Sequence, residues 1–471
     1  MTADPSLLAN DQTEDETSLA HMLKLAGPMV VATTSFTIMQ FVDRYMVSQL
    51  GTTALAAILP AGIVSFVPGT FAIGVMTSLN TFVSQSLGRG QRQDCANYYW
   101  QMIYVGIAYF LFVLAVMWPA APWIFRLMGQ PTGVAHLEVI YLRIMLYAHV
   151  LAVFNWASGQ FFMGIHRPII TMYASLCGQV VNVAANYALI FGKFGLPRME
   201  IAGAGWGTFI GIAVAATINL TVYLSGGINS AFESRRALRI DLGKVRDLLR
   251  VGLPAGFALM LNVALWGMIL FGLVGRFGRE APLAATSAVL SCANLSIMPV
   301  VGISMALTAA VGKAIGEGRK DLVPKQTRIC LRVALAYMGL VGVGFLIFRH
   351  RLVAFWSSDE EVIRIGAQML VCAAVYQVFH AARSIYGGAL RGTGDTMWLA
   401  MASGVGALVV LGLGGALVIA LIPSLGALGP WLAATLSIVA VGLANRWRFK
   451  SNIWMKIDLF KPGPVGVPVE V

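Results

Sequence analysis

Long apolar stretches recur along almost the whole chain and constrain its fold more than any other feature. A transmembrane helix needs about 20 mostly apolar residues to cross a hydrocarbon core of about 30 Å. Twelve such stretches occur, at 24–48, 54–82, 96–122, 136–162, 168–192, 201–225, 249–275, 282–312, 329–348, 362–390, 396–422 and 426–446. Only 11% of the 471 residues are charged, against about 25% in soluble domains. We therefore predict an all-α polytopic membrane protein with twelve transmembrane helices.

Basic residues gather in alternate loops and predict the orientation of the chain. They follow the even-numbered stretches, at positions 89, 92, 167, 235–250, 313–328, 391 and 448–461. The positive-inside rule places these loops, and with them both termini, in the cytoplasm. We expect a multi-pass protein of the cell inner (plasma) membrane. The net charge of +12 is then a topology signal, and we expect no nucleic acid partner.

The two halves of the chain resemble each other. Residues 23–28 (LKLAGP) resemble 249–254 (LRVGLP), 88–90 resemble 316–318, and 164–175 resemble 392–403. The members of each pair are separated by nearly the same number of residues, which is close to half the length of the chain. Both halves begin on the same predicted side, so we expect parallel repeats. Such repeats are related by an axis along the membrane normal, with a transport site between them.

This repeat gives the expected domain organisation. The expected units are a disordered cytoplasmic N-terminus (1–22), an N-lobe (23–225), a cytoplasmic inter-lobe linker (226–248), a C-lobe (249–447) and a cytoplasmic C-terminal tail (448–471). The first segment is polar and acidic. It lacks the basic region and cleavage pattern of a signal peptide.

Asp43 is the clearest ionisable residue at membrane depth. Inserting such a group costs roughly 2.5–3.5 kcal/mol, so it needs a role. One alternative is a local pair with Arg44 that reaches the interface, although neighbouring helical residues do not share a face. The other alternative is that Asp43 binds a cation or a proton.

Three polar residues of the first half also fall inside apolar stretches. Asn182 and Asn186 are spaced i,i+4 and share one helix face. Thr208 lies within the close-packing motif formed by Gly207 and Gly211, which would bring its hydroxyl near the asparagines. These groups either hold helices together or complete a site around Asp43.

The second half carries its own intramembrane polar residues. They are Asn262, Asn294, Gln377, His380 and Arg383. His380 and Arg383 are spaced i,i+3 and share a face. A buried histidine is either a structural donor or a proton carrier, and the sequence leaves both open.

Motifs of catalysis are missing from the sequence. It contains no G-x-x-x-x-G-K-[ST], no H-E-x-x-H and no G-x-S-x-G. The five cysteines are scattered, which indicates neither a disulfide framework nor a metal site. We expect a protein that is not an enzyme and that has no cofactor. A membrane-embedded enzyme is the alternative, and it would need clustered catalytic side chains.

The motifs, taken in order, resemble those of the MATE (multidrug and toxic compound extrusion) family over residues 20–450. They are Pro28, Asp43, Asn182 and Asn186, with the segments 81–90 (TFVSQSLGRG), 160–164 (QFFMG), 203–208 (GAGWGT) and 388–396 (GALRGTGDT). The segment 191–197 (FGKFGLP) is similar to the bacterial NorM-type branch.

The resemblance implies two six-helix lobes that open alternately to each side. It implies an antiporter that exports cationic or amphipathic drugs and toxic compounds against Na⁺ or H⁺. The cation-coupling residues that it implies are Asp43, Asn182, Asn186 and Thr208, with no metal beyond Na⁺ at Asp43. Substrate-cavity candidates are Gln40, Asn262, Gln377, His380 and Arg383. The expected partners are small-molecule drugs and the lipid bilayer, and we expect a monomer.

Two positions depart from the NorM-type pattern. The branch carries acidic residues in helices 7 and 10, where this chain has Asn262 and His380. The resemblance therefore points to Asp43 as the single coupling carboxylate. A lipid-linked oligosaccharide flippase of the same superfamily is the alternative transporter, and it should have a basic cavity for pyrophosphate.

Overall fold

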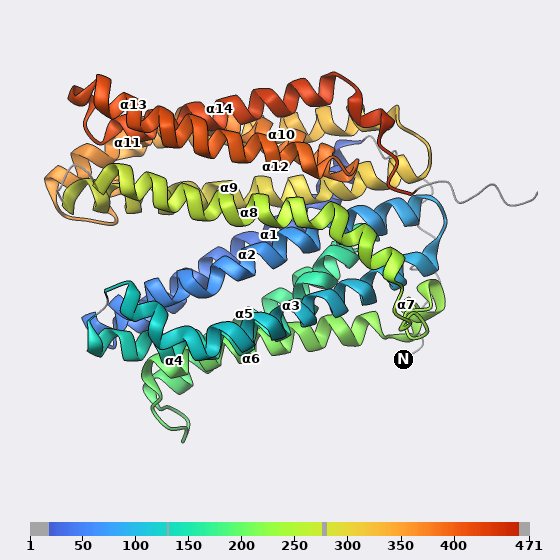
Figure 1. The fold of residues 1–471 in the computed structure, drawn as a ribbon, viewed down its shortest axis with the longest axis horizontal. Helices are drawn as coiled ribbons and strands as arrows, with labels where there is room; N and C mark the ends of the chain where they lie inside the picture. The colour runs from blue at the N-terminus through green and yellow to red at the C-terminus, as the bar shows by residue number, and fades with distance from the viewer. Residues whose placement is uncertain (1–17, 130, 276–279, 461–471) are drawn as a thin grey trace, which may run out of the picture.

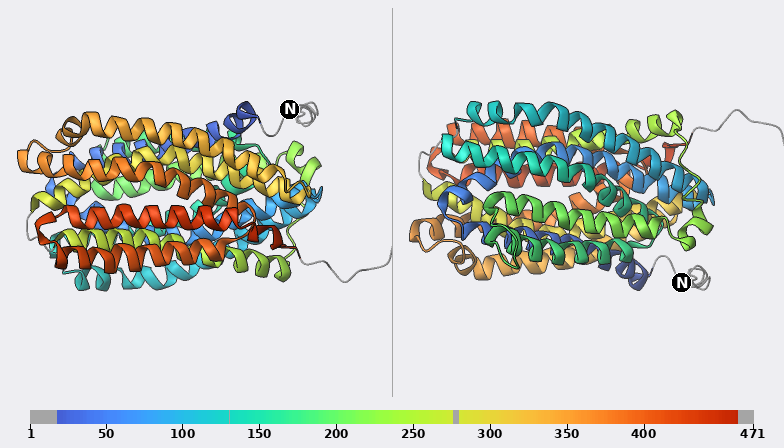
Figure 2. Two further views of the ribbon diagram at one scale, coloured as in Figure 1. Left: turned by 90° about the horizontal axis from the view of Figure 1, so that it is seen from above. Right: turned by 90° about the horizontal axis from the view of Figure 1, so that it is seen from below.

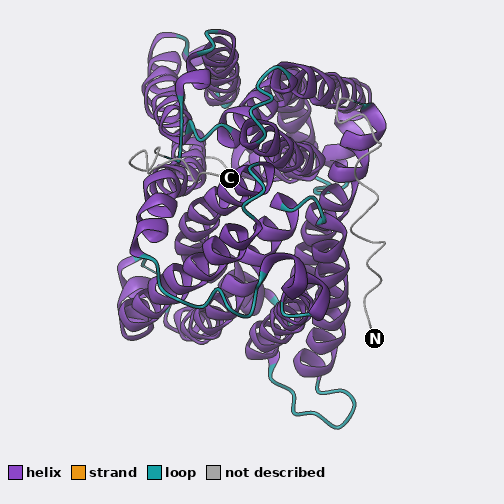
Figure 3. Cartoon of the chain, turned by 90° about the vertical axis from the view of Figure 1, so that its right-hand side faces the viewer, coloured by secondary structure: helices purple, strands orange, loops and turns teal. Residues whose placement is uncertain are grey.

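The computed structural model describes residues 18–129, 131–275 and 280–460 (Figure 1). Over these ranges it contains helices and no strand (Figure 3). The helices are α1 (Leu19–Ser48), α2 (Thr52–Gly88), α3 (Arg92–Leu127), α4 (Thr132–Gly164), α5 (Pro168–Phe191), α6 (Glu200–Tyr223), α7 (Gly226–Phe232), α8 (Leu242–Gly275), α9 (Glu280–Gly316), α10 (Leu322–Ala354), α11 (Glu360–Gly392), α12 (Thr396–Val405), α13 (Gly414–Leu421) and α14 (Leu428–Lys450). The predicted all-α fold class is confirmed.

Most of the helices are long enough to cross a membrane. Eleven described segments reach the length and mean hydropathy of a transmembrane span. The remaining expected span, 249–275, lies within α8, which has 34 residues. A helix of that length measures about 50 Å, so the longest helices extend past a hydrocarbon core. Span 396–422 is less regular than expected, because a π-helical segment, Gly406–Leu413, separates α12 from α13.

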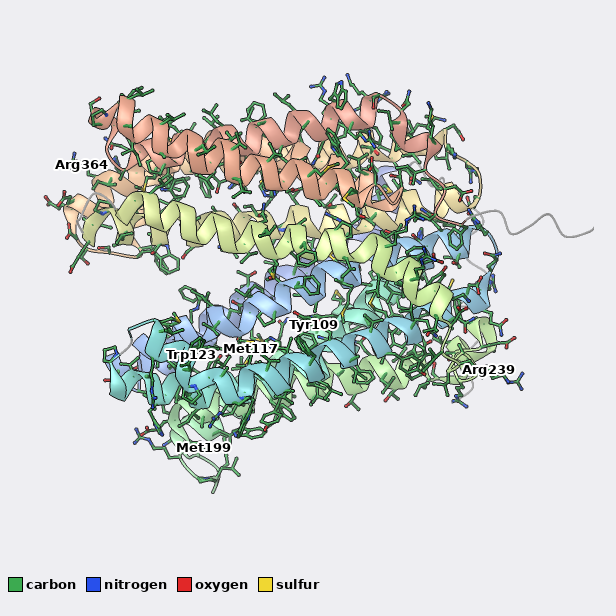
Figure 4. The ribbon with its side chains drawn as sticks, viewed as in Figure 1. Tyr109, Met117, Trp123, Met199, Arg239 and Arg364 are labelled. Carbon is green, nitrogen blue, oxygen red and sulfur yellow. The ribbon has the colours of Figure 1, made fainter. Side chains whose placement is uncertain are left out.

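The helices form two groups that run roughly parallel to the long axis of the molecule (Figures 1 and 2). We call α1–α6 the N-lobe and α8–α14 the C-lobe. The lobes meet at the end that carries α7 and spread apart at the other end (Figure 1). Figure 4 marks these ends, with Arg239 near the joined end and Trp123 and Arg364 near the spread end.

Glycines let the two lobes touch at the joined end. A Cβ atom on Gly88 of α2 would collide with the carbonyl oxygen of Lys313 in α9. A Cβ atom on Gly316 of α9 would collide in the same way with the carbonyl oxygen of Gln85. The two contacts are reciprocal, since Gly88 and Gly316, like Gln85 and Lys313, occupy equivalent positions of the two sequence repeats.

A second reciprocal contact lies further along the same interface. A Cβ on Gly74 would lie 2.6 Å from the carbonyl oxygen of Ala255 in α8. A Cβ on Gly302 would lie 2.8 Å from the backbone nitrogen of Val30 in α1. Gly74 and Gly302 have the same separation in the sequence as Gly88 and Gly316. The backbones of α2 and α8, and of α1 and α9, therefore approach too closely for larger residues.

Polar side chains of α2 complete the junction. Thr81 Oγ1 donates to the carbonyl oxygen of Arg391 at 2.9 Å, and Gln85 Nε2 donates to that of Gly392 at 2.9 Å. Asn80 Nδ2 donates to the carbonyl oxygen of Met305 at 3.3 Å. These bonds join the N-lobe to the backbone of the C-lobe and close the space between the lobes at this end.

The helix ends differ from the expected segment boundaries at three places. Helix α1 begins at Leu19, so the end of the expected disordered lead is helical, and residues 1–17 lie outside the described residues. The expected linker contains α7 and the start of α8. Helix α14 continues to Lys450, because its last turn still packs on the C-lobe through Phe449.

The described part of the tail then returns to the N-lobe. Asp458 pairs with Arg89 at 3.1 Å, and the Arg89 guanidinium lies 4.0 Å from the ring centroid of Phe460.

Candidate functional site

A chain of polar side chains connects three helices inside the N-lobe. Asn186 Nδ2 donates to Asp43 Oδ1 at 2.7 Å and lies 3.4 Å from Asn182 Oδ1. Asn182 Nδ2 donates to Thr208 Oγ1 at 3.3 Å, and that hydroxyl donates to the carbonyl oxygen of Ala204 at 3.0 Å. The structure thus brings together, from α1, α5 and α6, the four residues that the resemblance assigned to cation coupling. We call these four residues the coupling cluster.

Close packing of α5 on α6 builds this cluster. A Cβ on Gly207 would collide with Asn186 Oδ1, and a Cβ on Gly211 would lie 2.6 Å from the Cβ of Asn182. Only glycine leaves room for the asparagines at these positions. The close-packing motif seen in the sequence therefore sets the width of the cluster.

The cluster presents oxygen atoms of the kind that hard cations prefer. Asn186 is fully buried, and its Oδ1 has no hydrogen-bond partner among the described residues. The Asp43 carboxylate and Asn182 Oδ1 contact the Nδ2 atom of the same side chain, and Thr208 Oγ1 contacts Asn182 Nδ2. One carboxylate with neutral oxygens suits Na⁺, and a carboxylate alone suits a proton. The described residues contain no group of three or more His, Cys, Asp or Glu side chains that could hold a metal ion.

Asp43 and Arg44 do not pair with each other. Asp43 accepts its hydrogen bond from Asn186, and the described residues show no ion pair between it and Arg44. Successive residues on a helix point about 100° apart. Asp43 accordingly faces α5, whereas Arg44 faces a cavity on another side of α1. The described residues therefore do not show the first alternative for Asp43, a local pair with its neighbour.

A cavity of about 750 Å³ lies between the lobes, and we call it the central cavity. It is bounded by the part of α1 near Ser48, by α2, α8, α9, α11 and α14, and by residues just after α10. Its polar wall includes Gln40, Arg44, Asn262, Asn294, His380 and Arg383. Its aromatic wall consists of Phe36, Phe41, Phe66, Phe355, Trp356 and Tyr376.

Gln377 does not belong to this cavity, contrary to the expectation from the sequence. It is fully buried, and its Nε2 donates to Ser296 Oγ of α9 at 2.6 Å. On α11, Tyr376, His380 and Arg383 share the face toward the cavity. Gln377 is turned about 100° from Tyr376 and so faces α9.

The two basic residues of α11 sit differently in the cavity wall. His380 Nδ1 lies 3.2 Å from the hydroxyl of Ser384, which orients the ring. The Arg383 guanidinium has no hydrogen bond or ion pair to any described side chain. The sequence analysis did not predict the aromatic wall. Phe355 and Trp356 fall between apolar stretches and carry no pattern that separates them from other loop residues.

Comparison with known proteins identifies a matching family. The MatE family model matches residues 28–188 and 254–414. The first match begins at Pro28 and the second at Pro254, so the two matches follow the repeat seen in the sequence.

Curated relatives cover nearly the whole chain. A "Probable multidrug resistance protein NorM" of Rhizobium meliloti is 29% identical over 462 residues, covering 94% of this chain and 95% of that protein. A protein of the same name from Mesorhizobium japonicum is 28% identical over 442 residues, covering 92% and 94%. The resemblance to the NorM-type branch is confirmed.

Solved structures share the fold. One is the outward-facing conformation of a multidrug resistance MATE family transporter, with a TM-score of 0.86 and 20% identity, covering 95% of this chain and 100% of that chain. Another is a MOP superfamily transporter from Pyrococcus furiosus, described as having a binding pocket of reverse polarity. Its TM-score is 0.86 at 19% identity, with 95% and 100% covered. At this identity the likeness shows the fold alone.

Proposed function

The chain belongs to the MatE family, and from that premise we propose that it is an antiporter that exports amphipathic drugs in exchange for Na⁺ or H⁺. The relatives named as multidrug resistance proteins support drug efflux rather than catalysis. The family resemblance implies cationic drugs as the substrates.

One observation carries the coupling part of this proposal. Asp43 and Arg44 are neighbours on α1, yet one lies in the coupling cluster and the other in the central cavity. A cation or proton that binds Asp43 therefore acts on the same helix turn that contacts the substrate. Binding at one site shifts a conformational equilibrium only through different affinities for the two states. Helix α1 supplies such a link between the two sites.

Alternating access is the second part of the proposal. The lobes are joined at the α7 end by reciprocal glycine contacts and by the bonds of Thr81 and Gln85, while the central cavity lies nearer the spread end. The basic loops put the joined end in the cytoplasm. The conformation is then outward-open. Export requires a second state in which the contacts between α2 and α9 separate.

The test uses the purified protein in lipid vesicles. Rhodamine 123 and fluorescein are xanthene dyes of opposite charge, so transport can be detected whatever the charge of the substrate. We expect a Na⁺ or a H⁺ gradient, each imposed separately, to drive accumulation of at least one dye. Cysteine labelling of Gln91→Cys and Arg319→Cys, in a cysteine-free background, reports the orientation and should occur only from the cytoplasmic face. Accumulation of neither dye under either gradient would contradict the proposal.

A lipid-linked oligosaccharide flippase is the second candidate. A specific observation favours it, because Arg44 and Arg383 line one cavity although they come from opposite halves of the sequence. A basic cavity is what a pyrophosphate group requires.

A further inference from the structure

We propose that the central cavity selects amphipathic organic anions, and that Arg44 and Arg383 bind the negatively charged group. This inference rests on the proposed function as a transporter and specifies the class of its substrates. It differs from the cationic substrates that the family resemblance implies.

The charges of the cavity wall are of one sign. Arg44 and Arg383 line it, together with His380, and none of the described lining residues is acidic. The residues of α8 at 264–266 and 268–271, whose side chains are not described, include no Asp or Glu in the sequence. The nearest carboxylate along α1, that of Asp43, accepts a hydrogen bond from Asn186 in the N-lobe. Nothing in this wall offers a counter-charge to a cationic drug.

Neither guanidinium is paired with another side chain in the part of the chain that the structure describes. The described residues provide no ion pair and no side-chain hydrogen bond for Arg44 or for Arg383. Arg383 is half-buried in a largely apolar wall, where a charge is costly unless it is paired, whereas Arg44 is exposed. The planar guanidinium matches a carboxylate, sulfonate or phosphate through two parallel hydrogen bonds. A ligand that carries such a group would supply the negative charge that pairs with the guanidinium groups.

The aromatic side chains and the volume of the cavity indicate what the rest of the ligand is like. Six aromatic side chains face the cavity, and Phe41 and Trp356 meet edge to face with ring centroids 5.3 Å apart. A volume of about 750 Å³ fits a drug-sized molecule. The cavity therefore suits a molecule with an aromatic body and one acidic group. Aromatic faces also attract cations, but the two arginines repel them.

The departures from the NorM-type pattern point the same way. Asn262 and His380 line the cavity at positions where the resemblance expects acidic residues. Each replacement removes a negative charge, and His380 lies one helical turn from Arg383. The two changes leave the arginines as the dominant charges of the wall.

Anion export has an electrical signature. When one cation enters for each anion that leaves, at least two elementary charges move in the same electrical direction. A potential that is negative inside drives both movements. Exchange of one cation for one monovalent cationic drug moves no net charge. Transport of an anionic dye should therefore respond to membrane potential much more strongly than transport of a cationic dye.

The first experiment measures binding of fluorescein and rhodamine 123 to the full chain in detergent, by quenching of tryptophan fluorescence. We expect fluorescein to bind more tightly. Arg383→Gln should weaken fluorescein binding about tenfold or more, as expected for loss of a charge-assisted bond. Arg383→Lys should restore part of the affinity. Arg351→Gln, which removes a charge from the exposed end of α10, is the matched control and should bind like the parent.

The second experiment measures dye transport in vesicles under a potassium diffusion potential. A potential negative on the cytoplasmic face should speed fluorescein export and leave rhodamine 123 unchanged. Geranyl pyrophosphate, added as a competitor, identifies the source of the anion. A soluble aromatic carboxylate is the second competitor. If geranyl pyrophosphate displaces fluorescein at a far lower concentration than the carboxylate does, the natural ligand is a lipid-linked pyrophosphate. If the carboxylate displaces fluorescein at the lower concentration, the natural ligand is a soluble organic acid.

The outcomes separate the two proposals. Tighter binding and gradient-driven transport of rhodamine 123, with no fluorescein transport, would overturn the anion assignment and leave the antiporter intact. An Arg383→Gln variant that binds fluorescein like the parent would also overturn the assignment. Absence of transport of both dyes would overturn the proposed function itself.

Discussion

The N-lobe and the C-lobe share a backbone design but place opposite charges in different environments. In the N-lobe, Asp43 accepts a hydrogen bond from Asn186, which also contacts Asn182, and Asp43 does not line the central cavity. By the alignment of the two repeats, the matching positions of these three residues in the C-lobe are Ile269, Val410 and Gly414. The C-lobe therefore has no counterpart of the coupling cluster in its sequence.

Arg383, which lines the cavity, is a charge of the C-lobe that has no charged counterpart in the N-lobe. Arg383 of the C-lobe corresponds to Asn155 of the N-lobe. Asn155 Oδ1 accepts a hydrogen bond from Asn219 at 2.8 Å and so stays within its lobe. The comparison shows that contacts between backbones follow the repeat, whereas polar residues do not. We infer a division of labour in which the N-lobe binds the coupling ion and the C-lobe supplies the main charge for the substrate.

Asp43→Asn gives the sharpest test of this division and the largest expected effect. One charge crossing about 100 mV is worth roughly 2.3 kcal/mol, equivalent to about a fifty-fold concentration ratio. The variant should lose this gradient-driven accumulation while still binding dye. Dye uptake into vesicles under imposed Na⁺ or H⁺ gradients measures the loss. Asp321→Asn, at an exposed position before α10, should behave like the parent. If Asp43→Asn accumulates dye normally, the N-lobe does not hold the coupling site.

Substitution of Gly88 and Gly316 tests the close backbone contacts that both lobes share. Gly88→Ala and Gly316→Ala each place a Cβ against a backbone carbonyl oxygen of the other lobe. Overpacking of this kind typically costs about 1–3 kcal/mol. Both variants should lower the midpoint of thermal unfolding, and by similar amounts. Gly339→Ala in α10, where no atom lies within 4 Å of the added Cβ, is the control. Clearly unequal shifts for the two variants would show that the interface is not reciprocal.

Asn262→Ala should have the smallest effect. Asn262 lines the central cavity from α8 but carries no charge and is distant in sequence from the coupling cluster. We expect gradient-driven transport to stay within about twofold of the parent, as for loss of one weak neutral hydrogen bond. Initial rates of dye uptake provide the measurement. A loss as severe as that of Asp43→Asn would place a second coupling site in the C-lobe.

Sequence reasoning predicted the helical architecture because apolar length is a local property that each span carries by itself. It also grouped Asn182 with Asn186, since i,i+4 spacing defines a shared face. The connection to Asp43 came from family resemblance, because a contact between α1 and α5 leaves no local pattern. The same limit explains the failure at Gln377, whose direction depends on how α11 is rotated against α9. The aromatic wall brings together residues from separate segments of both lobes, and no spacing rule relates them.

The reciprocal contacts between Gly88 and Gly316 have the form of the interface in a two-fold symmetric dimer, where each partner offers the same patch. Two identical halves would build this interface equally well. They would also carry every side chain twice, so that any carboxylate in one half would recur in the other. Joining the halves in one chain lifts that restriction. The repeat position of Asp43 can then carry isoleucine in the second half, and that of Arg383 can carry asparagine in the first, while both halves keep the same close backbone contacts.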